Sequence, residues 1–155
     1  MPVDDERNTL QIGPPQREGH TAITQSMADA VRRRIEAAGG ELAVWAVLRE
    51  DVYETRFGDG FYLHVAGLAL NSEDAHALAA LAGDSPWVRW HVKAYQLGLA
   101  AGRPAFLRSW PKEEEFTIAD FVEILAGIPP GKACSKLCTG VQLYRHGPFI
   151  ELPAK

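Results

Sequence analysis

The stretch from Pro86 to Tyr95 alternates strictly between two sets of side chains over ten residues. Because successive side chains of a strand point to opposite sides of a sheet, this alternation predicts a half-buried strand. The face expected on the core carries Val88, Trp90, Val92 and Ala94. The other face forms a basic-aromatic ladder, which consists of Trp87, Arg89, His91, Lys93 and Tyr95.

Before this strand, the pattern predicts a helix and a β-hairpin. Apolar residues recur at helical spacing over 23–38, and the glycines 39–40 end that helix. The stretch 42–57 reads as a strand that is apolar on both faces at its start, which is typical of a central strand. Gly58-Asp59-Gly60 predicts a tight turn, because Asp and Gly tolerate positive φ, and 61–70 forms the returning strand.

Around the alternating strand, two further helices and two further strands are expected. Residues 71–72 offer a cap for a short Ala-rich helix that ends at Gly83. Glycines at 98 and 102 break the chain before a strand over 105–110. A Thr117 cap, stapled by Phe116 and Phe121, begins a helix that ends at Gly127. The closing run 141–152 is predicted to be a strand with a kink at Gly147-Pro148.

The expected order is thus helix, strand, strand, helix, strand, strand, helix, strand. The turn at 58–60 leaves no room for the crossover that a parallel neighbour would need, so the hairpin is predicted to be antiparallel. We therefore expect an α+β fold, with a mostly antiparallel sheet of about four to five strands and about three helices.

Length and composition favour one domain. A chain of 155 residues with 46% hydrophobic content can bury a stable core without metal or disulfide. Residues 1–20 combine acidic residues, Pro and Gly with few apolar side chains, so they do not offset the entropy of ordering. We expect a flexible N-terminal arm over 1–20 and a single α+β domain over 21–155.

The charge distribution excludes some functions and permits others. A net charge of −4 argues against a general nucleic-acid-binding protein. Residues 1–77 carry −6 and residues 78–155 carry +2, so a local basic surface is compatible with an acidic whole. No apolar run reaches the ~18 residues that span a bilayer, and the first residues lack the regions of a signal peptide. With only two cysteines, we expect a cytoplasmic protein of bacterial type.

The candidate site is the basic-aromatic ladder, extended by the final strand. If the strand over 141–152 lies beside the ladder strand, Tyr144 and His146 share a face with Arg89, His91 and Lys93. That group offers cations for charge-assisted hydrogen bonds, aromatic planes for stacking, and two imidazoles as proton carriers. Such a face suits an anionic ligand or an acidic partner, but it is also typical of the solvated side of an antiparallel sheet.

Other residues that often carry chemistry have simpler structural interpretations. His64 is expected to be a half-buried histidine with its hydrogen bonds satisfied, and His76 to face solvent. Asp51, Glu54 and Asp59 are expected to be turn and edge residues. The histidine spacing indicates no metal site, and we expect no cofactor.

Cys134 and Cys138 are separated by the spacing of one helical turn. On a helix both sulfurs would lie on one side, with Lys132 and Lys136 close enough to favour the thiolate. The pair then reads as a redox pair, as half of a metal site, or as two buried apolar side chains. The run from Gly127 to Ala133 lacks the spacing and the hydroxyl residue of a phosphate-binding loop.

The leading hypothesis is a non-catalytic binding or adaptor protein that uses the ladder for an acidic protein surface or a small anionic molecule. A homo-oligomer is compatible with this interpretation. The first alternative is a small enzyme with His91 or His146 as general acid or base, in which Arg89 and Lys93 hold an anionic substrate. The second is a partner-neutralising or chaperone-like protein that acts through its acidic N-terminal half.

Overall fold

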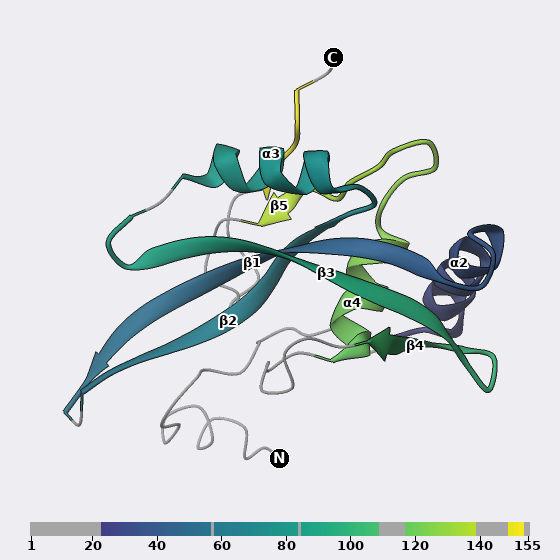
Figure 1. The fold of residues 1–155 in the computed structure, drawn as a ribbon, viewed down its shortest axis with the longest axis horizontal. Coiled ribbons are helices and arrows are strands. Elements are labelled where there is room, and N and C mark those ends of the chain that lie inside the picture. The colour runs from purple at the N-terminus through teal and green to yellow at the C-terminus, as the bar shows by residue number, and fades with distance from the viewer. Residues whose placement is uncertain (1–22, 57, 84, 109–116, 139–148, 154–155) are drawn as a thin grey trace.

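The computed structural model describes residues 23–56, 58–83, 85–108, 117–138 and 149–153, and it shows an α+β fold (Figure 1). The elements follow the predicted order, with one additional short strand near the end of the chain, so the predicted fold class is confirmed. The helices and strands are α2 (Gln25–Ala37), β1 (Leu42–Thr55), β2 (Gly58–Ala69), α3 (Ser72–Ala82), β3 (Val88–Ala100), β4 (Arg103–Arg108), α4 (Ile118–Ala126), β5 (Leu137–Cys138) and β6 (Phe149–Ile150).

Four antiparallel strands form the main sheet in the order β2-β1-β3-β4. β1 is internal and bonds to both β2 and β3, which confirms the central place predicted from its two apolar faces. The hairpin turns between Thr55 and Gly58, earlier in the chain than predicted. Gly58, Asp59 and Gly60 therefore belong to β2, and Gly58 uses its freedom from a side chain to adopt a φ of 121°.

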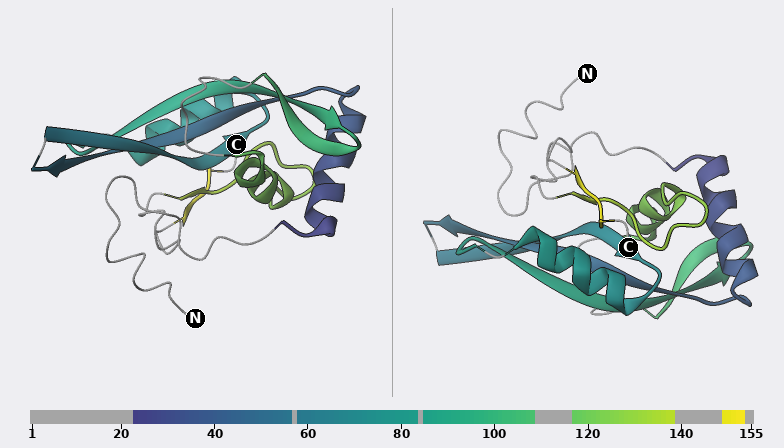
Figure 2. Two further views of the ribbon diagram at one scale, coloured as in Figure 1. Left: turned by 90° about the horizontal axis from the view of Figure 1, so that it is seen from below. Right: turned by 90° about the horizontal axis from the view of Figure 1, so that it is seen from above.

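Helices cover the two faces of this sheet toward opposite ends (Figures 1 and 2). α2 and α4 pack on one face, in a core that includes Val44 and Tyr95. α3 packs on the other face, where its Leu78 joins Val47 and the partly buried Trp90. The sheet therefore has a core on each side rather than one covered face and one solvated face.

The buried face of β3 changes halfway along the strand. Trp90 and Val92 contact the core under α3, whereas Tyr95 and Leu97 are buried on the opposite face under α2 and α4. Pairing between β3 and β1 runs through this point without a register shift. The change therefore comes from which helices lie above each half, and not from a β-bulge.

β3 is also longer than predicted. It continues through the buried Gly98 to Ala100, and the chain turns at Ala101 and Gly102, which have φ angles of 53° and 78°. A Cβ on Gly98 would lie 2.7 Å from the side chain of Leu107, so glycine serves close packing here instead of breaking the strand. β4 consequently begins at Arg103, before the predicted start at residue 105.

After α4, the chain returns to the outer edge of β2. The Leu70 N–H donates to the carbonyl of Ala133 at 2.7 Å, and the Ser135 N–H donates to the carbonyl of Leu68 at 2.9 Å. The Leu68 N–H in turn donates to the Ser135 hydroxyl oxygen at 3.0 Å. These bonds cover one end of an edge strand that would otherwise leave backbone groups available to another chain.

Residues 149–150 form a short strand that pairs with β5, with Leu137 opposite Ile150. In the final strand predicted over 141–152, residues 141–148 lie outside the described residues, as does the N-terminal arm over 1–20. Within the described ranges, no helix combines the length and the apolar character that crossing a membrane would require.

Candidate functional site

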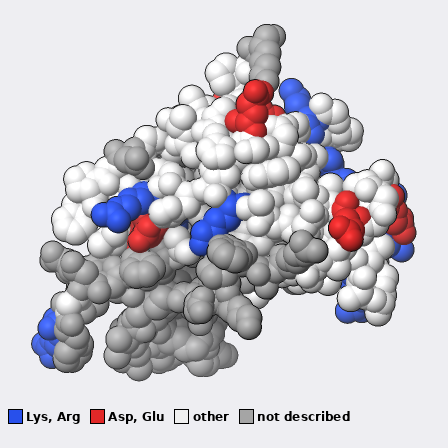
Figure 3. Space-filling model, in the orientation of Figure 1, with Lys and Arg blue, Asp and Glu red and all other residues white. Residues whose placement is uncertain are grey.

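The start of β3 presents two of the predicted ladder residues to solvent. Trp87 exposes 54% of its surface, and Arg89 is exposed as well. The Trp87 carbonyl accepts a hydrogen bond from the Val52 N–H at 2.9 Å, which ties this part of the chain to β1. Arg89 makes no ion pair with another described residue, so its guanidinium is available to an anionic group. Figure 3 shows basic side chains along the course of β3, with an acidic side chain beside them.

His91 is held by a carboxylate that the sequence interpretation did not include. Its Nε2 lies 2.6 Å from Oε1 of Glu50 on β1, and the His91 side chain remains 41% exposed. Glu50 stands opposite Arg89 in the strand pairing, so one acidic group lies among three ladder residues. The ladder surface is therefore a mixed one, in which a carboxylate orients the imidazole.

Tyr95 belongs to the core and not to the accessible surface. It is 3% exposed and contacts Phe121 edge to face at a ring-centroid distance of 4.8 Å. Phe106 completes a cluster of three rings, 5.8 Å from Tyr95 and 5.0 Å from Phe121. Such contacts add about 0.5–1.5 kcal/mol per pair beyond the burial of area. The ladder therefore ends at Lys93 as an accessible face.

Tyr144 and His146, which were expected to share this face, lie outside the described residues. The described neighbours of β3 are β1 and β4, and the described end of the predicted final strand, Phe149–Ile150, pairs with β5 instead. Their proximity to His91 therefore stays a prediction.

A second charged network lies on the opposite face of the same strands. The Asp51 carboxylate accepts hydrogen bonds from Arg49 Nε at 3.1 Å and from His64 Nε2 at 2.9 Å. The Arg49 guanidinium also lies 5.8 Å from the centre of the Trp90 ring. Arg49 and His64 are only 8% and 5% exposed, so the network is buried. Burial raises the pKa of Asp51, but the bonds from His64 and Arg49 lower it more, and the net pKa lies below its ordinary value.

This network confirms the buried, hydrogen-bonded role predicted for His64, whereas the role predicted for Asp51 as a turn or edge residue is wrong. Asp51 lies within the internal strand and is the acceptor that two buried donors share. The sequence does contain a sign of this network. Arg49 and Asp51 are two residues apart in a predicted strand, so their opposite charges lie on the same face. His76 is exposed, as predicted, and lies in hydrogen-bond contact with Ser72 of its own helix.

The two cysteines do not lie on a helical turn. Cys134 forms a β-bridge with Ala69, and Cys138 is in β5, so the segment between them is not helical. Four residues of extended chain separate Cα atoms by roughly 13 Å, whereas a disulfide needs a separation below about 7 Å. A direct disulfide therefore does not fit this conformation. Burial and the charge of Asp74 raise the pKa of the Cys134 thiol, against the opposing effect of Lys132.

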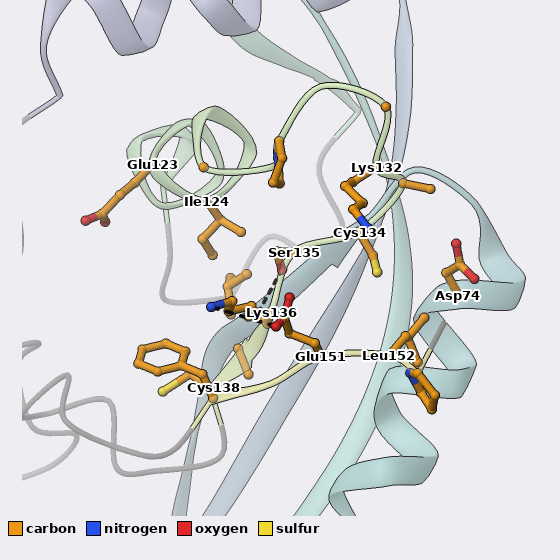
Figure 4. A pocket seen from close by; sticks show the side chains of 18 residues that line it. Asp74, Glu123, Ile124, Lys132, Cys134, Ser135, Lys136, Cys138, Glu151 and Leu152 are labelled. Atoms are coloured by element: carbon orange, nitrogen blue, oxygen red, sulfur yellow. Dashed lines mark hydrogen bonds and ion pairs between the residues drawn. The ribbon is translucent and has the colours of Figure 1, made fainter. Parts of the chain in front are cut away.

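Both cysteines line a cavity of about 550 Å³ between α4, the edge of β2 and the β5–β6 hairpin (Figure 4). This volume is within the range of small-molecule sites. None of its lining residues belongs to the basic-aromatic ladder. Its charged lining residues are Asp74, Glu123, Lys132, Lys136 and Glu151.

Chemically, the described residues form two kinds of site. The ladder offers an exposed cation and an oriented imidazole, while the cavity offers a partly open hollow with ammonium and carboxylate groups. Among the described residues, no group of three or more His, Cys, Asp or Glu side chains could hold a metal ion. Comparison with protein-family models, curated proteins and solved structures gave no match.

Proposed function

We propose that this protein is a non-catalytic binding protein of the bacterial cytosol that engages an acidic protein surface through Trp87 and Arg89. The observation that carries the proposal is the exposure of Trp87, at 54%, next to an exposed arginine that has no described ion-pair partner. Trp and Arg are the residue types that most often dominate binding free energy at protein interfaces.

The surroundings of these residues support binding over catalysis. Trp87 is anchored through its backbone to the central strand, which fixes where its side chain leaves the chain. A Trp side chain has only two χ angles to order, so it loses little conformational entropy when it binds. The described cavity lies elsewhere, which leaves the ladder as an open surface suited to a protein partner. A small anionic molecule bound at Arg89 is the narrower form of the same proposal.

The test is a quantitative pull-down from bacterial lysate followed by binding to the purified partner. Trp87→Ala and Arg89→Ala should each weaken binding by tenfold or more, on the order of 1.4 kcal/mol. Affinity should fall with salt for the wild type and less steeply for Arg89→Ala. Leu81→Ala and Arg33→Ala are matched controls, because both residues are exposed on other elements. Equal losses in the controls would contradict the proposal.

The His91–Glu50 pair favours a second candidate, a small enzyme that acts on an anionic substrate. A carboxylate 2.6 Å from one imidazole nitrogen orients the ring, as in catalytic His–carboxylate pairs. Purified protein incubated with pooled anionic metabolites would then yield a product. Turnover should fall on the order of 10² to 10⁴ in His91→Gln while substrate binding persists. Capture of a ligand without conversion supports the binding protein instead.

A further inference from the structure

The cavity between α4 and the β5–β6 hairpin carries an arrangement of charges that selects among ligands. Three of its five charged groups are acidic. Asp74 accepts a hydrogen bond from the Asn71 side chain at 3.0 Å, within the cap of α3. Glu123 points away from the centre of the cavity in Figure 4. Glu151 lies 3.9 Å from Lys136, so those two opposite charges offset each other.

The two basic groups of the cavity differ in their surroundings. Lys132 makes no ion pair with another residue of the described chain, and Figure 4 shows its side chain beside Cys134 at the cavity wall. The Lys136–Glu151 pair is long and solvated, with the two side chains 60% and 68% exposed, so it contributes little by itself. An anionic group that entered the cavity would find at Lys132 an ammonium that has no ion-pair partner among the described residues.

Apolar side chains from three elements complete the lining. Ile124 on α4 and Leu152 after β6 each pack against one of the two cores, which makes them fixed walls. Phe149 on β6 is 59% exposed, an unusual state for a large aromatic side chain that borders a cavity. Burying these surfaces against an apolar ligand would contribute favourable free energy in addition to the charge contacts.

We propose that this cavity binds a small organic anion, with its charged group at Lys132 and its apolar body against Ile124, Phe149 and Leu152. The site is separate from the ladder, so its failure would leave the proposed protein partner at Trp87 and Arg89 untouched. A volume of about 550 Å³ is sufficient for a ligand of two to three fused or linked rings.

A pair of fluorescent probes tests charge and shape separately. 8-Anilinonaphthalene-1-sulfonate carries a sulfonate on the same ring system as the uncharged N-phenyl-1-naphthylamine. The anionic probe should bind the full chain with saturation at one molecule per chain, and more tightly than the neutral probe. No saturable binding of the anionic probe below about 1 mM, or equal affinity for both probes, would overturn the proposal.

Variants then locate the site. Lys132→Gln should weaken the anionic probe roughly tenfold and change the neutral probe by less than about twofold. Phe149→Ala should weaken both probes. Arg33→Gln, which neutralises an exposed cation on α2, should change neither. An anionic probe that is insensitive to Lys132→Gln, or equally sensitive to Arg33→Gln, binds elsewhere and refutes the assignment.

The thiol of Cys134 provides an independent reporter of position, because it lines the cavity and is only partly buried. Saturating anionic probe should slow alkylation of Cys134 by N-ethylmaleimide in a Cys138→Ser protein that retains the wild-type circular dichroism spectrum. A Lys132→Gln version should show less protection at the same probe concentration. Unchanged alkylation with bound probe would place the probe outside the cavity.

Discussion

The two halves of β3 bury opposite faces although they form one uninterrupted strand. In the first half, Trp90 and Val92 pack under α3, and the other side carries Arg89, His91 and Lys93. Ala94, predicted on the core face with Trp90 and Val92, is exposed. From Tyr95 onward, the apolar side chains face α2 and α4. The first half therefore has a polar, accessible side, whereas both Tyr95 and Leu97 of the second half are buried on that same side.

This difference shows that one strand can bury opposite faces in its two halves. The twisted sheet receives helices on one side at one end and on the other side at the other end (Figure 2). Polar groups collect where helices do not cover the strand, and Glu50 can then pair with His91 in partial contact with solvent. The candidate binding surface is the uncovered half of one face.

Truncation of Tyr95 should have the largest effect on stability. Tyr95→Ala removes a buried ring from a three-ring cluster and should cost about 3–5 kcal/mol of unfolding free energy. Tyr95→Phe keeps the ring contacts and should cost about 1 kcal/mol or less. Denaturant unfolding measures both variants. If both variants lost similar amounts of unfolding free energy, the Tyr95 hydroxyl group, and not the packing of its ring, would be what stabilises this half of β3.

Trp90 tests the core on the other face. It is only partly buried but packs against the core under α3 and below the Arg49 guanidinium. We expect Trp90→Ala to cost about 2–4 kcal/mol, less than full burial would imply. Equilibrium unfolding beside Tyr95→Ala measures the difference. If Trp90→Ala lost less unfolding free energy than the truncation of an exposed residue, α3 would not be shielding this face from solvent.

The buried Asp51 network should make stability depend on acid. Asp51→Asn leaves Arg49 and His64 with a weaker acceptor and should cost about 1–3 kcal/mol at neutral pH. Because the pKa of Asp51 is lowered by folding, its contribution is complete above the unfolded pKa near 4. It is lost as the pH falls through the lower folded pKa.

Unfolding curves between about pH 7 and pH 2 should therefore show the wild type losing its advantage over Asp51→Asn only below about pH 4. Glu50→Gln is the matched control on the opposite face, where the pair with His91 is partly exposed. It should cost no more than about 1 kcal/mol. A constant gap between wild type and Asp51→Asn at all pH values would contradict the role of the Asp51 charge.

Trp87 should matter least for stability and most for binding. Its ring is 54% exposed, so Trp87→Ala should change unfolding free energy by about 0.5 kcal/mol or less. Thermal and denaturant midpoints beside those of Leu81→Ala, another exposed apolar residue, provide the comparison. A loss comparable to that of Trp90→Ala would show that Trp87 is a packing residue, which would remove the basis for its proposed role at an interface.

Local features of the chain were sufficient to predict the order and type of its elements. Asn71 caps α3, and Asp120 accepts a hydrogen bond from the Thr117 N–H at 2.9 Å at the start of α4, both within a few residues. The paired apolar faces of β1 likewise predicted its internal position. These features depend on spacing along the chain, which the sequence states directly.

The turn of the hairpin and the continuity of β3 through Gly98 were predicted less well. In both cases glycine was interpreted as a break, because its conformational freedom is a local property. At Gly98, the absence of a Cβ instead makes room for Leu107 from the neighbouring strand. A sequence shows that a glycine is present but not which neighbour approaches it.

Only the tertiary structure decided which polar residues meet. Asp51 joins His64 from the next strand, Glu50 joins His91 across 41 positions, and the Leu68 N–H bonds to the hydroxyl of Ser135 across 67. The cavity exists because the chain after α4 returns to the edge of β2 and carries Lys132, Cys134 and Lys136 with it. Periodicity determines which elements form, because it reflects neighbours two residues apart in a strand and three or four apart in a helix. Contacts between distant segments depend on how the helices distribute over the twisted sheet, and no local pattern contains that information.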